Sequence, residues 1–167
     1  MHDMPGPGYT RGHPRAMLIH ELTEAECHDI LSRSRLARLA CSRDDQPYVV
    51  PVSFSYDPRS SCLYCFSAVG KKIEWMRENP KVCAEIEDIQ DRTHWNTVVV
   101  VGRYDEIGDA PEDRATRDRV LQLFQERAAQ WWLPGAATTD GTDRPAIVVY
   151  RIRIDRVTGR RADRSTG

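Results

Sequence analysis

Phe66-Ser67-Ala68-Val69-Gly70-Lys71-Lys72 is the stretch at which an apolar strand ends and an amphipathic helix begins. The residues before it, Cys62 to Phe66, are apolar enough for a buried strand. After it, apolar residues recur at helical spacing until Asn79-Pro80, a pair that ends helices. The pattern predicts a strand–turn–helix unit with two lysines in the first helical turn.

These two lysines indicate a candidate phosphate site. Peptide dipoles and unpaired N–H groups already make the start of a helix positive, so each cation there costs roughly 0.3–1 kcal/mol. An anion held between Ser67, the glycine turn, Lys71 and Lys72 would reverse that cost, and a phosphate group suits this place. The alternative is a solvated face on which Glu74 is a local partner of the lysines.

The composition is that of an ordinary globular protein with one domain. The chain has 167 residues, of which 40% are hydrophobic and 29% are charged, and its formal net charge is −1. Because there is no basic excess, the chain lacks the electrostatic footprint expected of a protein that binds nucleic acid or an acidic membrane.

The sequence indicates no targeting or membrane-spanning segment. No apolar run approaches the roughly 20 residues that span a bilayer. Residues 1–15 are rich in Pro, Gly and His and contain no apolar segment of the signal-peptide type. We therefore expect a cytoplasmic protein with a flexible arm over residues 1–17, one domain over 18–161 and a polar tail over 162–167.

Five cysteines, an odd number, argue against a disulfide framework. Cys62 and Cys65 have the Cys-x-x-Cys spacing, but they fall inside a predicted strand, where positions three apart point to opposite faces. No second pair completes a zinc site. We interpret the cysteines as buried packing residues and expect no metal site.

Hydrophobic periodicity predicts six strands and further helices. A capping box that starts at Thr23 opens a helix ending near Ser34, and residues 112–132 form an amphipathic helix. Pro51 has no N–H to donate, so it marks an edge or a bulge within its strand. The apolar run 98–101 indicates a strand buried on both faces. The predicted strands are residues 35–42, 48–56, 62–67, 81–89, 95–107 and 146–157.

The connections between these strands are short and hairpin-like. They favour a small antiparallel barrel, mainly β with minor α, over a βαβ sheet. The chain contains no Gly-rich Rossmann or Walker fingerprint.

Four pieces in this order carry a family resemblance over residues 22–160. The chain resembles the FMN-binding split-barrel superfamily of pyridoxamine 5′-phosphate oxidase-like proteins, and within it most closely the nitroimidazole-resistance (Nim-type) branch. The resemblance implies a six-stranded antiparallel split β-barrel with short flanking helices. The pieces are residues 49–56, residues 63–72 with Asn79-Pro80, Trp95 to Val98 leading to Val101-Gly102, and Val157-Thr158-Gly159-Arg160.

The resemblance also implies a homodimer with FMN in each of two clefts between the subunits. The second strand would pass the isoalloxazine ring, Ser67 and Ala68 would lie by the ribityl chain, and the two lysines would pair with the phosphate. Trp95 and its neighbours would form a wall of the site. The implied cofactor-binding residues are Val50, Pro51, Val52, Ser53, Phe66, Ser67, Ala68, Lys71, Lys72, Trp95 and Thr97.

The chain departs from the Nim-type pattern at one position. Phe66 stands where that branch carries a histidine, so chemistry attributed to the histidine is not carried over. His94 abuts the proposed wall and is interpreted as a satisfied surface residue rather than a catalytic one. Arg160 either reaches the cofactor or substrate or is solvated, and Trp131-Trp132 is interpreted as a packing or dimer contact.

Three functions remain open at this point. The first is an FMN-dependent oxidoreductase that passes hydride or electrons through the flavin to a small organic acceptor, with unknown catalytic residues. The second keeps the fold and binds a deazaflavin or haem. The third is a non-catalytic dimer that binds a flavin or another small molecule. The sequence does not name the substrate or the electron donor.

Overall fold

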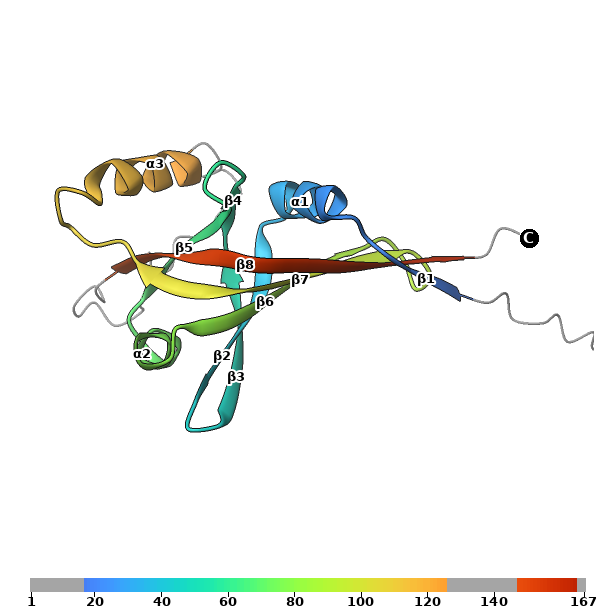
Figure 1. The fold of residues 1–167 in the computed structure, drawn as a ribbon, viewed down its shortest axis with the longest axis horizontal. Coiled ribbons are helices and arrows are strands. Elements are labelled where there is room, and N and C mark those ends of the chain that lie inside the picture. Colours follow the sequence, from blue (N-terminus) through green and yellow to red (C-terminus); the bar gives the residue numbers. More distant parts are fainter. Residues whose placement is uncertain (1–16, 126–146, 165–167) are drawn as a thin grey trace, which may run out of the picture.

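The computed structural model describes residues 17–125 and 147–164, which form eight strands and three helices (Figure 1). β7 and β8 are the longest strands, and α1 and α3 lie on the opposite side of them from α2. In chain order the elements are β1 (Met17–Glu21), α1 (Glu24–Arg33), β2 (Leu36–Arg43), β3 (Gln46–Ser53), β4 (Ser55–Asp57), β5 (Cys62–Ala68), α2 (Lys71–Glu78), β6 (Lys81–Ile89), β7 (Trp95–Glu106), α3 (Arg114–Gln125) and β8 (Ile147–Arg164).

All strand pairs are antiparallel, in the order β3-β2-β6-β7-β8-β5-β4, and β1 pairs with β8. The two edge strands, β3 and β4, are separated in sequence only by Phe54. The chain therefore passes directly from one edge of the sheet to the other, and β3 also contacts β5. This passage curls the sheet into a barrel and confirms the predicted mainly-β barrel class.

The sequence predicted one continuous strand over residues 48–56. The structure divides this segment into two strands, β3 and β4, so that prediction was wrong. At the break, Phe54 is fully buried and its N–H donates to the carbonyl oxygen of Arg35 at 3.0 Å, and the next residue, Ser55, already pairs with Tyr64 of β5. The predicted alternation holds within β3, where Val52 is buried and Val49 is 58% exposed. Pro51 lies on an edge strand, as predicted.

The other end of the sheet is longer than predicted. β8 continues to Arg164 instead of ending at Val157, and residues 160–164 pair with β1, a strand that the sequence did not indicate. Gly159 lies within this extended part of β8. A Cβ at this position would lie 2.7 Å from Leu22 Cδ1 and 2.8 Å from Cys27 Sγ, so the glycine allows β8 to pass close beneath α1.

The interior contains two apolar clusters. The main core fills the barrel and includes Cys65, and a smaller cluster beneath α3 includes Cys62 and Val120. The two cysteines thus point to opposite faces, as predicted, and all five cysteines are free. The predicted helix 112–132 is observed as Arg114–Gln125, whereas Trp131-Trp132 lies outside the described residues.

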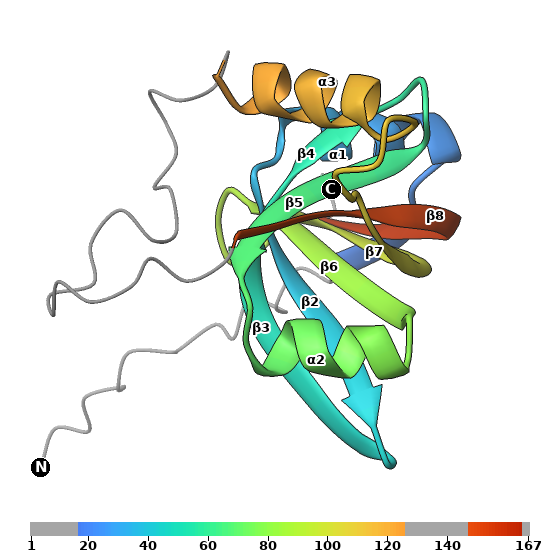
Figure 2. The same ribbon diagram turned by 90° about the vertical axis from the view of Figure 1, so that its left-hand side faces the viewer.

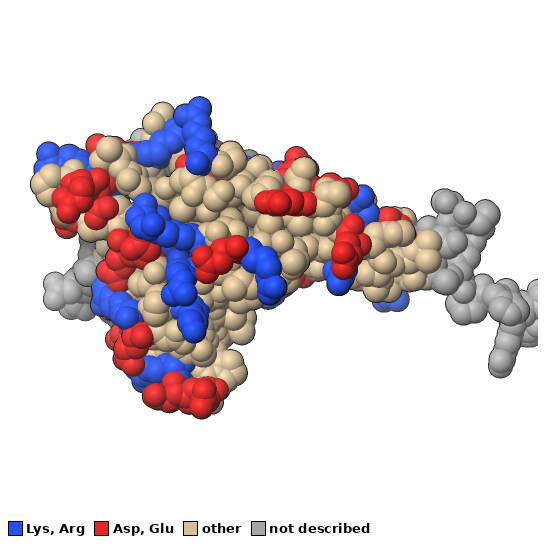
Figure 3. All heavy atoms as spheres, viewed as in Figure 1, with Lys and Arg blue, Asp and Glu red and all other residues tan. Residues whose placement is uncertain are grey.

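Charges of both signs are interspersed over the face drawn in Figure 3, in keeping with a net charge near zero. Several form ion pairs across neighbouring strands, such as Asp105 with Arg151 and Arg153. No helix in the part of the chain that the structure describes is long and apolar enough to cross a membrane.

A bulge between β7 and β8 gives a test of this packing. Val101 pairs with Arg156 but Gly102 pairs with Ile154, and a Cβ on Gly102 would lie 2.3 Å from the carbonyl oxygen of Arg153. We expect Gly102→Ala to lower the free energy of unfolding by about 1–3 kcal/mol, because the two backbones must separate. Urea denaturation measures the change.

The matched control is Gly108→Ala in the exposed loop before α3, where only the flexible carboxylate of Asp113 comes within 3.3 Å. This variant should stay within about 0.5 kcal/mol of the unmodified chain. Equal stability of the two variants would contradict the close approach at Gly102.

Candidate functional site

The structure brings Ser67 and Lys72 together at the start of α2. Ser67, near the end of β5, is 6% exposed, and Lys72 Nζ donates to its Oγ at 2.5 Å. The same hydroxyl donates to the carbonyl oxygen of Ala68 at 2.8 Å. Burial lowers the pKa of Lys72 below its usual value, because a half-buried ammonium group loses hydration.

Lys71 points elsewhere, although the sequence placed both lysines on one phosphate. Its Nζ lies 4.4 Å from the centre of the Tyr48 ring and 4.5 Å from that of Trp75. Consecutive helical residues project about 100° apart, so the two side chains leave the helix in different directions. The two lysines of the predicted site are therefore distinct. We call Lys72, which is half-buried beside Ser67, the inner lysine, and Lys71, which is exposed over Tyr48, the outer lysine.

Polar contacts and ring packing fix α2 on the β2–β3 hairpin, across which it lies in Figure 2. Asn79, which follows the helix, donates from Nδ2 to the carbonyl oxygen of Ser42 at 3.1 Å. Arg43 binds Glu78 at 3.0 Å, and the rings of Tyr48 and Trp75 lie 5.6 Å apart. These contacts hold the middle and the end of α2 on the hairpin, and the position of Lys71 over Tyr48 brings its first turn beside β3. Gly70, the residue before the helix, supplies no side-chain cap, so no side chain of its own satisfies the first N–H groups.

The predicted residues of β3 lie along a sheet edge. β3 pairs with β2 only among the described strands, so alternate backbone groups point away from that ladder. The side chains of Val50 and Val52 face the core, whereas those of Pro51 and Ser53 face outward. Because β3 contacts β5, this edge and Ser67 belong to one region of the molecule.

Phe66 lies on the other side of β5 from Ser67. Its ring packs edge-on against Phe124 of α3 with ring centres 4.5 Å apart. A ligand on the Ser67 side would therefore meet the backbone of Phe66 rather than its ring. The prediction from the sequence named Phe66 as cofactor-binding without saying whether its ring or its backbone would contact the cofactor.

Trp95 and Thr97 lie far from Ser67 in the same chain. Ser67 pairs with Val148 and Thr97 pairs with Arg160, twelve residues further along β8, which is roughly 40 Å of strand. Thr97 also lines a hollow of about 240 Å³ beside Val99, Val157 and Glu21. One chain thus does not bring all the predicted residues to one place.

A broad sheet face near Thr97 has no helix over it among the described residues. Cross-strand register places Pro51, Arg38, Glu85 and Val99 in one row of this face. A second row contains Val49, Ala40, Cys83 and Val101. We call the side of β2, β3, β6 and β7 that carries these eight residues the outer face.

The outer face corrects one prediction from the sequence. The run 98–101 indicated burial on both faces, but in one chain only Val98 and Val100 are fully buried. Val99 and Val101 are half-buried on the outer face.

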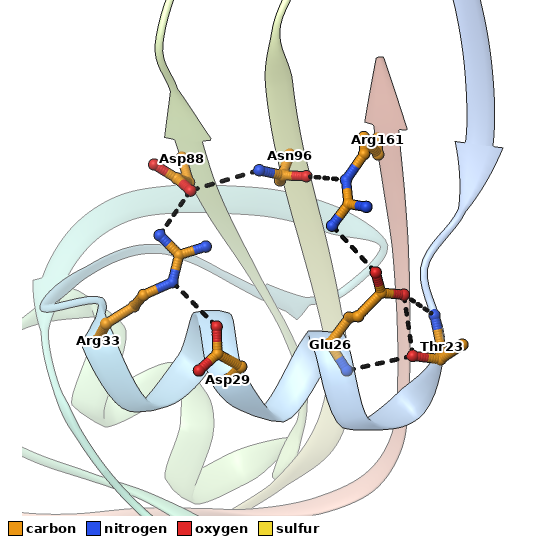
Figure 4. Close-up of polar contacts among 7 residues, drawn as sticks. All are labelled: Thr23, Glu26, Asp29, Arg33, Asp88, Asn96 and Arg161. Carbon is orange, nitrogen blue, oxygen red and sulfur yellow. Dashed lines mark hydrogen bonds and ion pairs between the residues drawn. The ribbon is translucent and has the colours of Figure 1, made fainter. Parts of the chain in front are cut away.

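In a polar network near Trp95, the arginines form ion pairs with acidic residues of the same network (Figure 4). Arg33 of α1 binds Asp88 at 2.7 Å and Asp29 at 3.3 Å, while Arg161 binds Glu26 at 3.0 Å and Asn96 at 3.0 Å. These residues adjoin a hollow of about 380 Å³ that Trp95 also lines. Since both guanidinium groups are already paired, this hollow is a weaker anion site than the start of α2. Local sequence patterns give no signal for this network, because its members come from α1, β6, β7 and β8.

The remaining candidates have structural partners. His94 Nδ1 lies 2.9 Å from the Asp91 carboxylate, and Arg160 pairs with Glu21 across β1. Burial raises the pKa of the Cys65 thiol to about 12, which disfavours a thiolate. Within residues 17–125 and 147–164, no cluster of three His, Cys, Asp or Glu residues is placed to hold a metal ion.

Comparison with known proteins identifies relatives along nearly the whole chain. The family model for pyridoxamine 5′-phosphate oxidase matches residues 23–161. The uncharacterized protein RA0666 of Rhizobium meliloti (strain 1021) is 36% identical over 149 residues, which cover 87% of this chain and 97% of that protein. The crystal structure of an FAD-binding protein (mll6688) from Mesorhizobium loti is 38% identical, with a TM-score of 0.71 and coverage of 89% and 99% of the two chains.

The Nim-type likeness is weaker. A proposed 5-nitroimidazole antibiotic resistance protein from Bacteroides thetaiotaomicron is 18% identical, with a TM-score of 0.61 and coverage of 93% of this chain and 99% of that one. At this identity the match shows a shared fold alone. The barrel topology, the match over residues 23–161 and the identity to these relatives agree: the chain belongs to the pyridoxamine 5′-phosphate oxidase family.

Proposed function

We propose that the protein is a flavin-dependent oxidoreductase that works as a homodimer and holds the flavin phosphate at Ser67 and Lys72. The observation that carries this proposal is the 2.5 Å contact between the Lys72 ammonium group and the buried Ser67 hydroxyl at the start of α2. The FAD-binding description of the similar Mesorhizobium loti protein supports a flavin. FMN, the cofactor expected from the sequence, and the FMN half of FAD present the same first phosphate to this site.

The residues present fit a phosphate group. Lys72 supplies a cation, Ser67 a hydroxyl and the first turn of α2 unpaired N–H groups, and all three favour an anion. A bound phosphate would also offset the cost that burial imposes on the ammonium group. The adjacent edge of β3 offers backbone groups for the flat ring, and Pro51 there adds an apolar surface.

The division of the predicted site supports two subunits. Trp95 and Thr97 are at one end of β8 and Ser67 is near the other, so these residues meet one ligand only if a second chain contributes one group. The outer face offers a surface for that chain, since Val99 and Val101 remain half-buried there. Face-to-face packing of two copies would complete the burial that the valine run predicts.

The bound flavin would supply hydride and electron transfer through its own ring. The chain would bind and orient the cofactor, and Trp95 of one subunit would shield the site of the other. The histidine chemistry of the Nim-type branch is not part of this proposal, since Phe66 occupies that position and packs on Phe124. The acceptor is proposed to be a small organic molecule.

Substitution of the inner lysine tests the phosphate site. We expect Lys72→Met to weaken FMN binding by about 1.5–3 kcal/mol, or roughly 10- to 100-fold in Kd, because one charge-assisted contact is lost. Titration of flavin fluorescence measures the affinity. Lys81→Met, which removes an exposed lysine beyond the other end of α2, is the control and should leave Kd unchanged. Equal Kd values for the two variants would remove the basis of the assigned site.

The pH dependence of binding offers a second test. Only protonated Lys72 carries the charge that attracts phosphate, and burial lowers its pKa in the flavin-free protein. The contribution of the Lys72 charge to FMN affinity should therefore be fully present below this lowered pKa, and it should be lost as the pH rises through it. The comparison with Lys72→Met separates this fall from titration of the flavin itself. A fall of the same size in the variant would assign it to another group.

The dimer is tested by a charge on the outer face. We expect Val99→Arg to convert the dimer to monomers and to abolish FMN binding, because an arginine cannot be buried there without a partner. The single chain tolerates the arginine, since position 99 is only half-buried there and the side chain can reach solvent, while its cross-strand neighbour Glu85 is already paired with Arg38 at 3.1 Å. Sedimentation velocity measures the mass. Leu121→Arg on α3, where the side chain is 47% exposed, is the control. A dimeric Val99→Arg would place the interface elsewhere.

A further inference from the structure

The ammonium group of the outer lysine, Lys71, lies over aromatic rings and not at Ser67, where Lys72 lies. Its side chain is exposed and diverges from that of Lys72 at the adjacent position of the helix. Its ammonium group is nevertheless fixed, since it lies over Tyr48 at 4.4 Å and over Trp75 at 4.5 Å. Cation–π contacts of this kind order a lysine without neutralising its charge.

In the described part of the chain, Arg43 also lies over Trp75 but, unlike Lys71, is paired with an acidic residue. The guanidinium carbon of Arg43 lies 5.2 Å from the centre of the Trp75 ring, and Glu78 binds this arginine at 3.0 Å. In residues 17–125 and 147–164, the ammonium group of Lys71 is flanked by aromatic rings and forms no ion pair of this kind. An ordered charge with no acidic partner among the described residues thus lies one residue from the proposed phosphate site.

We propose that the flavin nucleotide is FAD and that Lys71 selects it over FMN by pairing with the second phosphate. This inference rests on the proposed function. The two phosphates of FAD are joined by one bridging oxygen, so a second phosphate lies beside the first. Lys72 and Lys71, on consecutive positions of the first helical turn, extend the cationic surface from Ser67 toward Tyr48 on β3. FMN leaves Lys71 without a partner, whereas FAD supplies one.

Three flavins separate the two phosphates experimentally. Riboflavin has no phosphate, FMN has the first, and FAD adds the second together with an adenosine. The change that each variant makes in the ratio of successive Kd values therefore reports the phosphate that its lysine contacts. We would measure Kd for all three by fluorescence titration with the full chain and with Lys71→Met, Lys72→Met and Lys81→Met. Thermal unfolding of each variant checks that the fold is retained.

We expect the unmodified chain to bind FAD about tenfold more tightly than FMN, which is the scale of one exposed charge-assisted contact. Lys71→Met should abolish this preference and leave the ratio of FMN to riboflavin unchanged. Lys72→Met should do the reverse, and Lys81→Met should preserve both ratios. Lys71→Arg, which keeps the charge, should retain a preference for FAD.

The outcomes distinguish this inference from the proposed function. Equal affinity of the unmodified chain for FAD and FMN, or equal weakening of both by Lys71→Met, overturns the role of Lys71. A preference for FMN over riboflavin that depends on Lys72 would then still support the proposed function. Failure of the unmodified chain to bind any of the three flavins overturns both.

Discussion

The passage of the chain from one sheet edge to the other is the constraint on which the rest of the structure depends. β3 and β4 are the two edges of the sheet, yet only Phe54 separates them in sequence. The barrel is therefore closed by the chain itself, which runs from β3 into β4, and not by backbone hydrogen bonds between these two edge strands. Phe54 fixes the crossing because its side chain is fully buried and its N–H is bonded to Arg35. Among the described strands, β3 keeps an unpaired edge as a result, and β3 also contacts β5.

The candidate site follows from this closure. β5 runs into α2 through Gly70, and α2 is fixed on the β2–β3 hairpin by Asn79, Arg43 and the packing of Trp75 on Tyr48. The start of α2 is thereby held beside the free edge of β3. A half-buried lysine in such a place costs hydration energy, which a permanent anionic ligand would offset. The fold thus combines a rigid cationic site with an edge of unused backbone groups.

Much of this arrangement could be predicted from local sequence patterns. β6 begins and ends as predicted, and the unit of β5 and α2 was readily recognised because strand periodicity, a glycine and an Asn-Pro stop follow one another. The break at Phe54, β1 and the last residues of β8 were not predicted. These features depend on pairing between segments far apart in sequence, such as Met17 with Arg164, for which a local pattern carries no signal. The same holds for the network that joins Arg33 to Asp88 and Arg161 to Glu26.

The valine run shows how a failed expectation becomes informative. Four consecutive valines are typical of a strand buried on both sides, yet in one chain Val99 and Val101 are only half-buried. An antiparallel sheet with one solvated face would instead alternate apolar with polar residues. The pattern of β7 is therefore matched to an environment that a single copy does not provide. Sequence and structure disagree about one chain, and the proposed dimer would reconcile them by covering the outer face with a second copy.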